Sequence, residues 1–249
     1  LAELRWISEN QESWNSHFEL IADIDASETV SWNRGNGFSP IGKSGQEFQG
    51  IFKTKNNCTI SNITINNIHK DYLGFFGYTS GARIDGVKVE NISVVGDSYI
   101  GGLIGYASET KITNSSSQGN IFGQDSVGGL IGLTDESRIS KSYSEGKING
   151  NGSVGGLIGN CSDTKISRSY SASIITGNNY VGGLIGVTNG WGSDKSEVND
   201  SYGEGMVNGN SSVGGLVGRL GGDVIWNSYS RSAVTGNSSV GGFVGSNSG

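Results

Sequence analysis

The sequence predicts an all-β fold, a parallel β-helix (solenoid) of about eight coils, on two observations: a fixed repeat and short β-branched apolar runs. The phrase Val-Gly-Gly-Leu-Ile-Gly at 127–132 returns, with small changes, at 100–105, 154–159, 181–186, 213–218 and 240–245. The first glycines of the copies from Gly101 to Gly182 are 27 residues apart, and one later step is 32 residues. A fixed period of this size is typical of repeats that stack on their neighbours.

The apolar runs between these phrases indicate strands. An aliphatic residue stands eleven residues after the first glycine, as at Ile139, and a serine follows three residues later, as at Ser142. The runs are too short for helices but suit strands separated by glycine and asparagine turns. Glycine allows a positive φ and leaves no Cβ between neighbouring coils. We therefore expect about three short strands per coil, with neighbouring coils about 4.8 Å apart.

The repeat also has a family resemblance. Val-Gly-Gly-Leu-Ile-Gly followed by Ile-x-x-Ser-Tyr-Ser-x-Gly-x-Ile-x-Gly resembles the GLUG-motif repeat of secreted and surface-exposed microbial proteins, and the likeness covers residues 48–245. Similar repeats occur in bacterial adhesins and in non-catalytic regions of some immunoglobulin A-specific metallopeptidases. The resemblance therefore implies a right-handed β-helix at a cell surface. Lys53 and Thr54 depart from it, because aspartate and glycine are usual at these places in the first coil.

Two domains are expected: residues 1–47 form a small N-terminal α/β cap, and residues 48–249 form the β-helix. Apolar residues fall at helical spacing in 1–7, and residues 15–25 then change to a strand pattern. A cap of this kind shields the backbone and the core at the open end of a β-helix. Three tryptophans lie in this segment, where packing within the cap is favoured over an aromatic platform for sugars: Trp6, Trp14 and Trp32.

Five aromatic residues are the candidate binding residues, namely Trp191, Tyr143, Tyr170, Tyr202 and Tyr229. The tyrosines occupy one position in consecutive coils, four residues after an aliphatic position. Counting with period 2 therefore favours rings that point inward and neighbouring serines that point outward. The alternative is an external aromatic stripe able to stack on sugars. Trp191 lies in the one lengthened turn, where folding back over the helix is slightly favoured over a free binding tip.

Charged residues also recur in register in the short turns of consecutive coils. Glu109, Glu136 and Asp163 form one predicted row, and a second row of bases follows two residues later at Lys111, Arg138 and Lys165. A column of acids is one way to bind calcium, which prefers several oxygen ligands. The neighbouring bases instead favour two surface rows that compensate each other, with little effect on stability.

Composition excludes several function classes. The net charge of -6 and the pI near 4.9 disfavour nucleic-acid binding, which needs a basic surface. No apolar run is long enough to span a membrane. The two histidines, His17 and His69, do not stand in a zinc-protease motif, and the strand positions are mostly serine, threonine, asparagine and glycine. We therefore expect no enzyme, no catalytic residue, no metal site and no cofactor.

The favoured function is a non-enzymatic module of a secreted or cell-surface protein, an adhesin or stalk segment that contacts carbohydrate or a protein of a host or neighbouring cell. One alternative is an ice-binding solenoid. Its ice-facing surface would be formed by the pairs Ser115/Ser117, Ser142/Ser144, Ser169/Ser171 and Ser228/Ser230. The other alternative is a β-helix enzyme that degrades glycans.

The ends of the chain carry further expectations. Leu1 is not preceded by a signal peptide, which indicates a mature or excised piece. The repeat has just begun again at Gly241 when the sequence stops, so Val240, Phe243 and Val244 are expected to be exposed. An open coil of this kind favours end-to-end self-association or a neighbouring domain at the C-terminal end.

Overall fold

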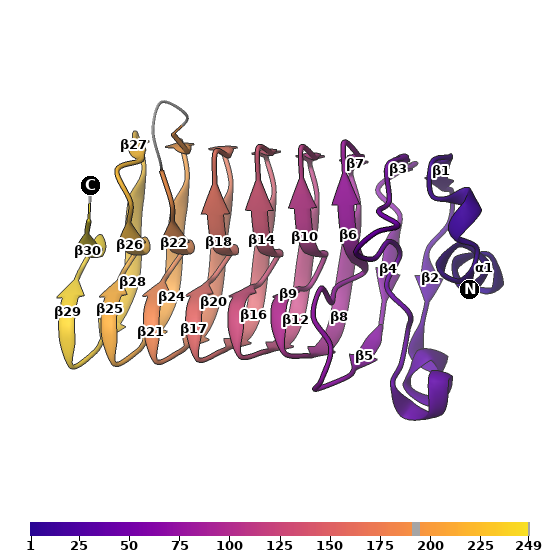
Figure 1. The fold of residues 1–249 in the computed structure, drawn as a ribbon, viewed down its shortest axis with the longest axis horizontal. Coiled ribbons are helices and arrows are strands. Elements are labelled where there is room, and N and C mark those ends of the chain that lie inside the picture. The colour runs from indigo at the N-terminus through magenta and orange to yellow at the C-terminus, as the bar shows by residue number, and fades with distance from the viewer. Residues whose placement is uncertain (191–194, 249) are drawn as a thin grey trace.

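The computed structural model describes residues 1–190 and 195–248, which form a parallel β-solenoid of about seven turns (Figure 1). Equivalent strands of successive coils are hydrogen-bonded into long parallel sheets, each named here by its first strand. The β1 sheet contains β1 (His17–Leu20), β3 (Ile51–Thr54), β7 (Arg83–Asp85), β11 (Lys111–Thr113), β15 (Arg138–Ser140), β19 (Lys165–Ser167), β23 (Glu197–Asn199) and β27 (Val224–Trp226). The β2 sheet contains β2 (Ile24–Asp25), β4 (Thr59–Ser61), β8 (Lys88–Val95), β12 (Ser116–Phe122), β16 (Tyr143–Asn149), β20 (Tyr170–Thr176), β24 (Tyr202–Asn208) and β28 (Tyr229–Thr235), and β5 (Thr64–Asn66) pairs with β8.

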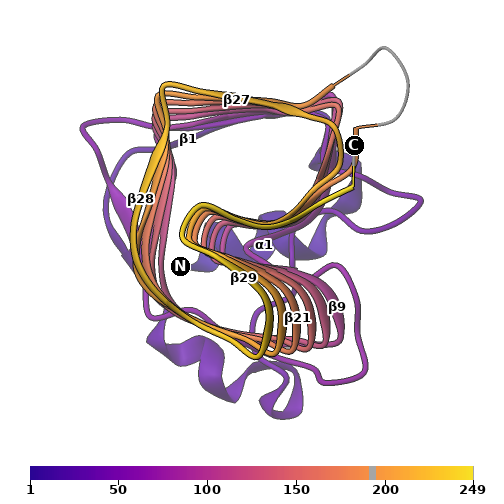
Figure 2. The ribbon, with the colours of Figure 1, turned by 90° about the vertical axis from the view of Figure 1, so that its left-hand side faces the viewer.

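Two further sheets complete each coil. The β9 sheet contains β9 (Ser98–Gly101), β13 (Asp125–Gly128), β17 (Gly152–Gly155), β21 (Asn179–Gly182), β25 (Ser211–Gly214) and β29 (Ser238–Gly241). The β6 sheet contains β6 (Phe76–Ser80), β10 (Ile104–Ser108), β14 (Ile131–Asp135), β18 (Ile158–Ser162), β22 (Ile185–Thr188), β26 (Val217–Leu220) and β30 (Val244–Asn247). Viewed from the C-terminal end, the chain passes from β27 to β28 and then β29 counter-clockwise while it advances toward the viewer (Figure 2). The coil is therefore right-handed, the hand that parallel crossovers favour.

A coil has four strands, so the expectation of about three is wrong. The repeated phrase does not form one strand: β13 ends at Gly128, and β14 begins at Ile131 after a bend. The β9 and β6 sheets are folded toward each other at this bend, which gives the coil its indented outline (Figure 2). The sequence pattern does not reveal that the phrase forms two strands, because both halves carry buried aliphatic residues, Val127 and Ile131.

The glycines of the phrase are required by close packing of the backbone at this bend. A Cβ on Gly128 would lie 2.0 Å from the Ile131 carbonyl oxygen, and one on Gly129 would lie 2.3 Å from the Gly156 carbonyl oxygen. Real Cβ atoms do not approach backbone this closely, so neither position accepts a side chain without moving the coil. The left-handed conformation that the coil needs lies elsewhere, at non-glycine corner residues such as Ser126 (φ 51°) and Lys141 (φ 53°).

Buried serines satisfy the backbone at the corner between the β1 and β2 sheets. Ser142 is fully buried, its Oγ accepts the Ser115 N–H at 3.2 Å, and its hydroxyl donates to the Ser140 carbonyl at 3.0 Å. Ser169 receives the Ser142 N–H in the same way at 3.2 Å. A serine hydroxyl in each coil thus replaces the strand-to-strand backbone hydrogen bond that the left-handed corner interrupts. The buried backbone N–H groups are therefore kept paired.

The N-terminal end combines helices with strands that already belong to the solenoid. Helix α1 (Ala2–Glu9) and the 3-10 turns η1 (Gln11–Ser13) and η2 (Ser27–Gly35) flank β1 and β2, which pair in parallel with β3 and β4. Trp14 is buried, and its indole N–H donates to the Ile7 carbonyl at 2.8 Å. Trp32 packs under the Arg5 guanidinium at 4.9 Å, whereas Trp6 is 54% exposed.

At the other end, the last coil exposes apolar side chains that are buried in the coils before it. Val213 is fully buried, but its partner in the next coil, Val240, is 46% exposed, and Phe243 is exposed as well.

The two cysteines, Cys58 and Cys161, are buried and have free thiols. Among the described residues, no helix has the length and apolar character needed to cross a bilayer.

Candidate functional site: a cleft beside a tyrosine cluster

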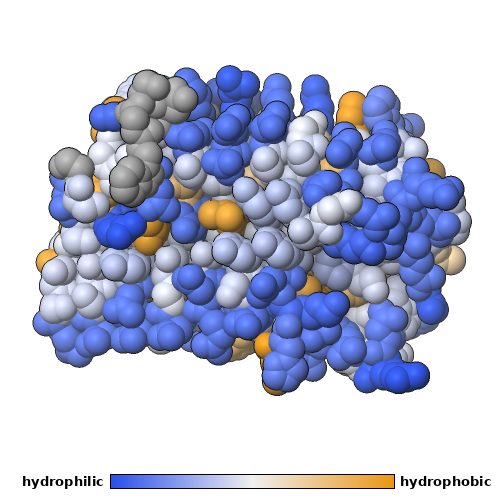
Figure 3. All heavy atoms as spheres, viewed as in Figure 1, coloured by the Kyte–Doolittle hydropathy of each residue, from blue (hydrophilic) through white to orange (hydrophobic). Residues whose placement is uncertain are grey.

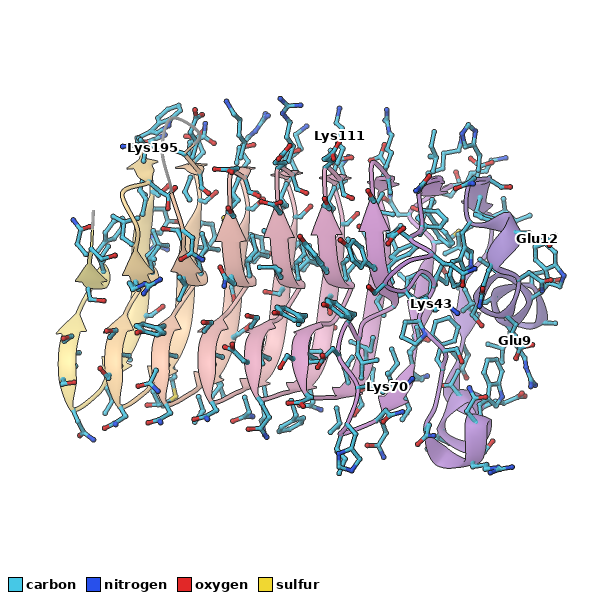
Figure 4. The ribbon with its side chains drawn as sticks, in the orientation of Figure 1. Glu9, Glu12, Lys43, Lys70, Lys111 and Lys195 are labelled. Atoms are coloured by element: carbon cyan, nitrogen blue, oxygen red, sulfur yellow. The ribbon has the colours of Figure 1, made fainter. Side chains whose placement is uncertain are left out.

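A cleft of about 670 Å³ lies where the helical end meets the first coils. Its walls come from the end of α1, from the segment after η2 and from the loop that follows β5. Figure 4 shows the labelled side chains of Glu9, Lys43 and Lys70, one from each wall. Trp14 and Phe38, both nearly fully buried, form part of its apolar lining. The volume falls within the usual range for pockets that hold small molecules or a few sugar units.

Several polar side chains of the cleft have no partner within the described part of the chain. Those of Asn36, Asn67, Lys43 and Lys70 make no hydrogen bond or ion pair there. Asp71 is engaged differently, because its Oδ1 accepts the Ser98 N–H at 3.1 Å and fixes the loop after β5 against β9. The cleft thus presents amide donors and acceptors and ammonium groups over an aromatic lining, a combination suited to hydroxyl-rich or anionic ligands.

One edge of the cleft is formed by Tyr72, which belongs to a cluster of four tyrosines. Tyr72 stacks on Tyr99 with ring centroids 4.9 Å apart and planes at 10°. Tyr78 and Tyr106 form a second pair at 4.5 Å, and Tyr72 lies 6.2 Å from Tyr106. The four rings are partly buried and lie beside the bend between the β9 and β6 sheets, and Tyr72 is the member that lines the cleft.

Local sequence and glycine packing explain why these rings meet. Tyr72 and Tyr99 stand one repeat apart at the left-handed corner before the glycine phrase (φ 58° and 59°), whereas the next coil has Ser126 there. Tyr78 and Tyr106 are register partners in the β6 sheet. A Cβ on Gly105 would lie 2.5 Å from the Tyr72 carbonyl carbon, so the absence of a side chain brings the two sheets together. The cluster was missed from sequence, although comparing this corner position among the repeats reveals it.

Burial sets the protonation state of the cluster. It is the largest cause that raises the pKa of Tyr106, of Tyr78 and of Tyr72 above the ordinary tyrosine value. For Tyr106, coulombic repulsion from Tyr78 and Asp135 raises the pKa in the same direction. The phenols of Tyr72, Tyr78 and Tyr106 therefore stay neutral across the physiological range and can donate hydrogen bonds to a ligand.

The sequence-predicted tyrosines lie on a different surface, the outer face of the β2 sheet. Tyr143, Tyr170, Tyr202 and Tyr229 stack in register, with successive centroids 4.9, 5.0 and 5.0 Å apart and planes within 3°. The favoured inward orientation is wrong, because the rings are outside and the neighbouring Ser142 and Ser144 are buried. The left-handed Lys141 turns the chain between Ile139 and Tyr143 and resets the alternation.

This tyrosine ladder offers few open ring faces. Each inner ring is covered on both faces by its neighbours, and the Arg231 guanidinium lies 5.1 Å from the Tyr229 ring. Sugars stack on ring faces, so the ladder presents mainly edges and hydroxyls to solvent. None of the ladder tyrosines lines the cleft. The fifth sequence-predicted residue, Trp191, lies outside the described residues.

The serine rows do not form the face that ice binding would need. Ser115, Ser117, Ser142, Ser144, Ser169 and Ser171 are all at most 1% exposed. The hydroxyls of Ser115, Ser142, Ser144 and Ser169 donate to backbone carbonyls inside the solenoid. Only the pair Ser228/Ser230, in the last coil, is partly exposed. The structure therefore contradicts the ice-binding alternative in the form that the sequence suggested. The described residues also contain no group of three or more His, Cys, Asp or Glu side chains able to hold a metal ion.

The charged rows keep the register expected from sequence. Lys111, Arg138 and Lys165 are direct partners in the β1 sheet. The mutual compensation expected from sequence is not seen as ion pairing: within the described residues, no ion pair joins Lys111 or Arg138 to an acid.

Comparison with known proteins identifies the repeat. Residues 96–121, from the end of β8 to β12, match the model of the GLUG motif. The chain contains a GLUG motif. The strands stacked on this segment keep its pattern in register, as Ile100 pairs with Val127 and Ile121 with Ile148, so the neighbouring coil has the same construction.

A second comparison finds halomucin of Haloquadratum walsbyi, which is 35% identical over 127 residues. The match covers 49% of this chain but only 1% of halomucin, so it relates about half of this chain to a small part of a much longer protein.

Proposed function

We propose that the chain is a non-enzymatic module of a secreted or cell-surface protein that binds carbohydrate in the cleft. In this proposal the solenoid acts as an adhesin or stalk segment and holds the cleft on a rigid body. The GLUG motif supports the surface setting, because similar repeats occur in surface-exposed microbial proteins. The observation that carries the proposal is the position of two amides, Asn36 and Asn67, in a cleft edged by Tyr72, where neither has a partner among the described residues.

The cleft suits a sugar for two physical reasons. A pyranose ring has apolar C–H faces that pack on aromatic surface, which the Tyr72 end of the cleft supplies. Its hydroxyls need both donors and acceptors, which an asparagine amide provides together. The ammonium groups of Lys43 and Lys70 can additionally receive a carboxylate or sulfate on the sugar.

A glycan array probed with the purified chain tests the proposal. We expect binding to a limited set of glycans, lost in Asn67→Ala and in Tyr72→Ser. Asn67→Ala removes a side chain without a bond in the described structure, so its effect would not come from unfolding. Tyr229→Ser is the matched control, because it removes a tyrosine from the ladder and should leave glycan binding unchanged.

Two results would contradict the proposal. One is glycan binding that persists in both cleft variants, or that is lost only when the ladder is changed. The other is the release of new reducing ends from a bound glycan, which would show an enzyme. An array without any binding, followed by capture of a purified surface protein through the cleft, would replace carbohydrate by protein as the ligand class.

A further inference from the structure

The outer face of the β1 sheet carries two rows of cations with a row of hydroxyls between them. The first row comes from the starts of β7, β11, β15 and β19. The hydroxyls stand two residues later on β11, β15 and β19, where β7 has Asp85. The second row lies at the left-handed corner that follows. The members of this basic track are Arg83, Lys111, Arg138 and Lys165, then Thr113, Ser140 and Ser167, then Lys141 and Arg168.

Most of these cations have no counter-charge among the residues that the structure describes. Arg83 pairs with Asp85 at 3.0 Å and Lys165 with Glu197 at 3.3 Å, which are the two ends of the first row. Lys111, Arg138, Lys141 and Arg168 are exposed and form no ion pair within the described residues. Figure 4 shows Lys111 projecting from the upper edge of the solenoid, and Figure 3 shows that edge as a line of hydrophilic side chains.

Stacking places like charges unfavourably close. Register partners such as Lys111 and Arg138 start from backbones about 4.8 Å apart, and like charges directly opposite each other in a sheet destabilise it. Beyond the track, the same register position of the β1 sheet is not basic: Ile51 precedes Arg83, and Val224 follows Glu197. The cations are thus confined to consecutive central coils, although the chain as a whole has a net charge of -6. A bound polyanion would remove the repulsion.

We propose that the basic track binds a linear anionic polysaccharide laid along the solenoid axis. Its carboxylates or sulfates would lie between the two cation rows and pair with Lys111, Arg138 and the corner bases. The hydroxyls of Ser140 and Ser167 are partly buried and make no hydrogen bond in the described structure, so they are available to the sugar hydroxyls. This site is separate from the cleft, and its existence does not depend on carbohydrate binding there.

The charge pattern favours a sparsely charged single chain over nucleic acid. Each row offers one cation per coil, about every 4.8 Å, whereas duplex DNA carries one charge per about 1.7 Å of its axis. Glu109 and Glu136 stand two residues before Lys111 and Arg138, so acids border the track on one side. A broad, dense polyanion would meet these acids, while a narrow chain fits between the two rows of bases.

Binding to three polymers at low ionic strength tests the proposal: dextran sulfate, polygalacturonate and uncharged dextran. We expect retention of dextran sulfate or polygalacturonate, no retention of dextran, and an affinity that falls as salt rises. The two charged polymers distinguish sulfate from carboxylate as the recognised group. Lys111→Ser/Arg138→Ser should weaken binding by about tenfold or more and reduce its salt dependence, because two anion contacts are removed.

The controls use charges outside the track and outside the cleft. Arg138→Ser is compared with Lys147→Ser, which removes an exposed cation from the same coil but from the β2 sheet. Only the first should weaken binding. Ser140→Asp places an acid between the two cation rows. It should also weaken polyanion binding, although it removes no contact of the fold.

Equal losses in the Arg138 and Lys147 variants, or no retention of either charged polymer, would overturn the proposal. Tighter binding of duplex DNA with the same dependence on Arg138 would reassign the track to nucleic acid. The cleft variant Asn67→Ala should leave polyanion binding intact, so failure of one site is distinguishable from failure of the other.

Discussion

The ring of Tyr143 lies flat on the ring of Tyr170 in the next coil, with centroids 4.9 Å apart and planes 3° from parallel. This distance is close to the spacing of the strands that carry the rings, so each coil is held at the separation that aromatic stacking also favours. The ladder therefore acts on the register and stability of the solenoid, while the one tyrosine that lines the cleft, Tyr72, belongs to the other cluster.

Tyrosine deletions along the ladder should differ according to the number of stacked neighbours. Tyr170 stacks on two rings and Tyr143 on one within the described residues. At about 0.5–1.5 kcal/mol per aromatic pair, Tyr170→Ser should lower the free energy of unfolding by ~1–3 kcal/mol and Tyr143→Ser by about half as much. Denaturant unfolding measures both. Equal losses in the two variants would mean that the rings contribute through burial alone.

The parts of the fold that could be predicted from sequence are those set by the period. Because the phrase around Gly128 recurs every 27 residues, the stacking of coils and the alignment of Tyr143 with Tyr170 follow without a structure. The direction of the tyrosines could not be predicted by alternation. It depends on a left-handed backbone at Lys141, a residue type that carries no signal for this conformation.

The candidate site was even less accessible from sequence. Its cleft is formed by irregular segments around Asn36, Lys43 and Asn67, which share no period and meet only through the packing of α1 and the first coils. By contrast, the corner position that holds Ser126 in one repeat holds Tyr99 and Tyr72 in the two repeats before it. This difference is visible in the sequence once the repeats are aligned. The cluster was thus predictable in principle, and its contact with the cleft was not.

Alkaline pH should weaken the ladder. Burial, followed by the charge of Glu145, raises the pKa of Tyr170 to about 12, above the usual value near 10. The unfolded chain then loses its phenolic proton first, so the stability contributed by neutral Tyr170 is complete below pH 10 and is lost as pH rises from 10 toward 12.

Denaturant unfolding across this pH range, with phenolate absorbance recorded in parallel, checks the expectation for Tyr170. Tyr170→Phe keeps a ring without an ionisable hydroxyl and should show a shallower loss of stability. A variant curve parallel to that of the wild type would assign the alkaline loss to other groups.

One glycine position should tolerate alanine in the last coil and reject it in an inner one. A Cβ on Gly129 would lie 2.3 Å from the Gly156 carbonyl oxygen, whereas one on the equivalent Gly242 would have no atom within 4 Å. Gly129→Ala should therefore cost about 2–4 kcal/mol of unfolding free energy, and Gly242→Ala less than about 0.5 kcal/mol. Thermal and denaturant unfolding of the two variants provide the comparison. Similar stabilities would show that the bend relaxes around a methyl group.

The thiol of Cys161 should report on opening of the solenoid. Burial is the main reason that its pKa is raised to about 12, and its Sγ–H donates to Ser196 Oγ at 3.4 Å. Thiolate is the reactive form, so a thiol reagent at neutral pH should not modify Cys161 until the coil opens. A Cys58→Ser chain leaves this single thiol and makes the signal unambiguous. We expect the labelling rate to rise with denaturant in parallel with the loss of strand signal. Rapid labelling in native buffer would show that the coil containing β18 opens locally without unfolding of its neighbours.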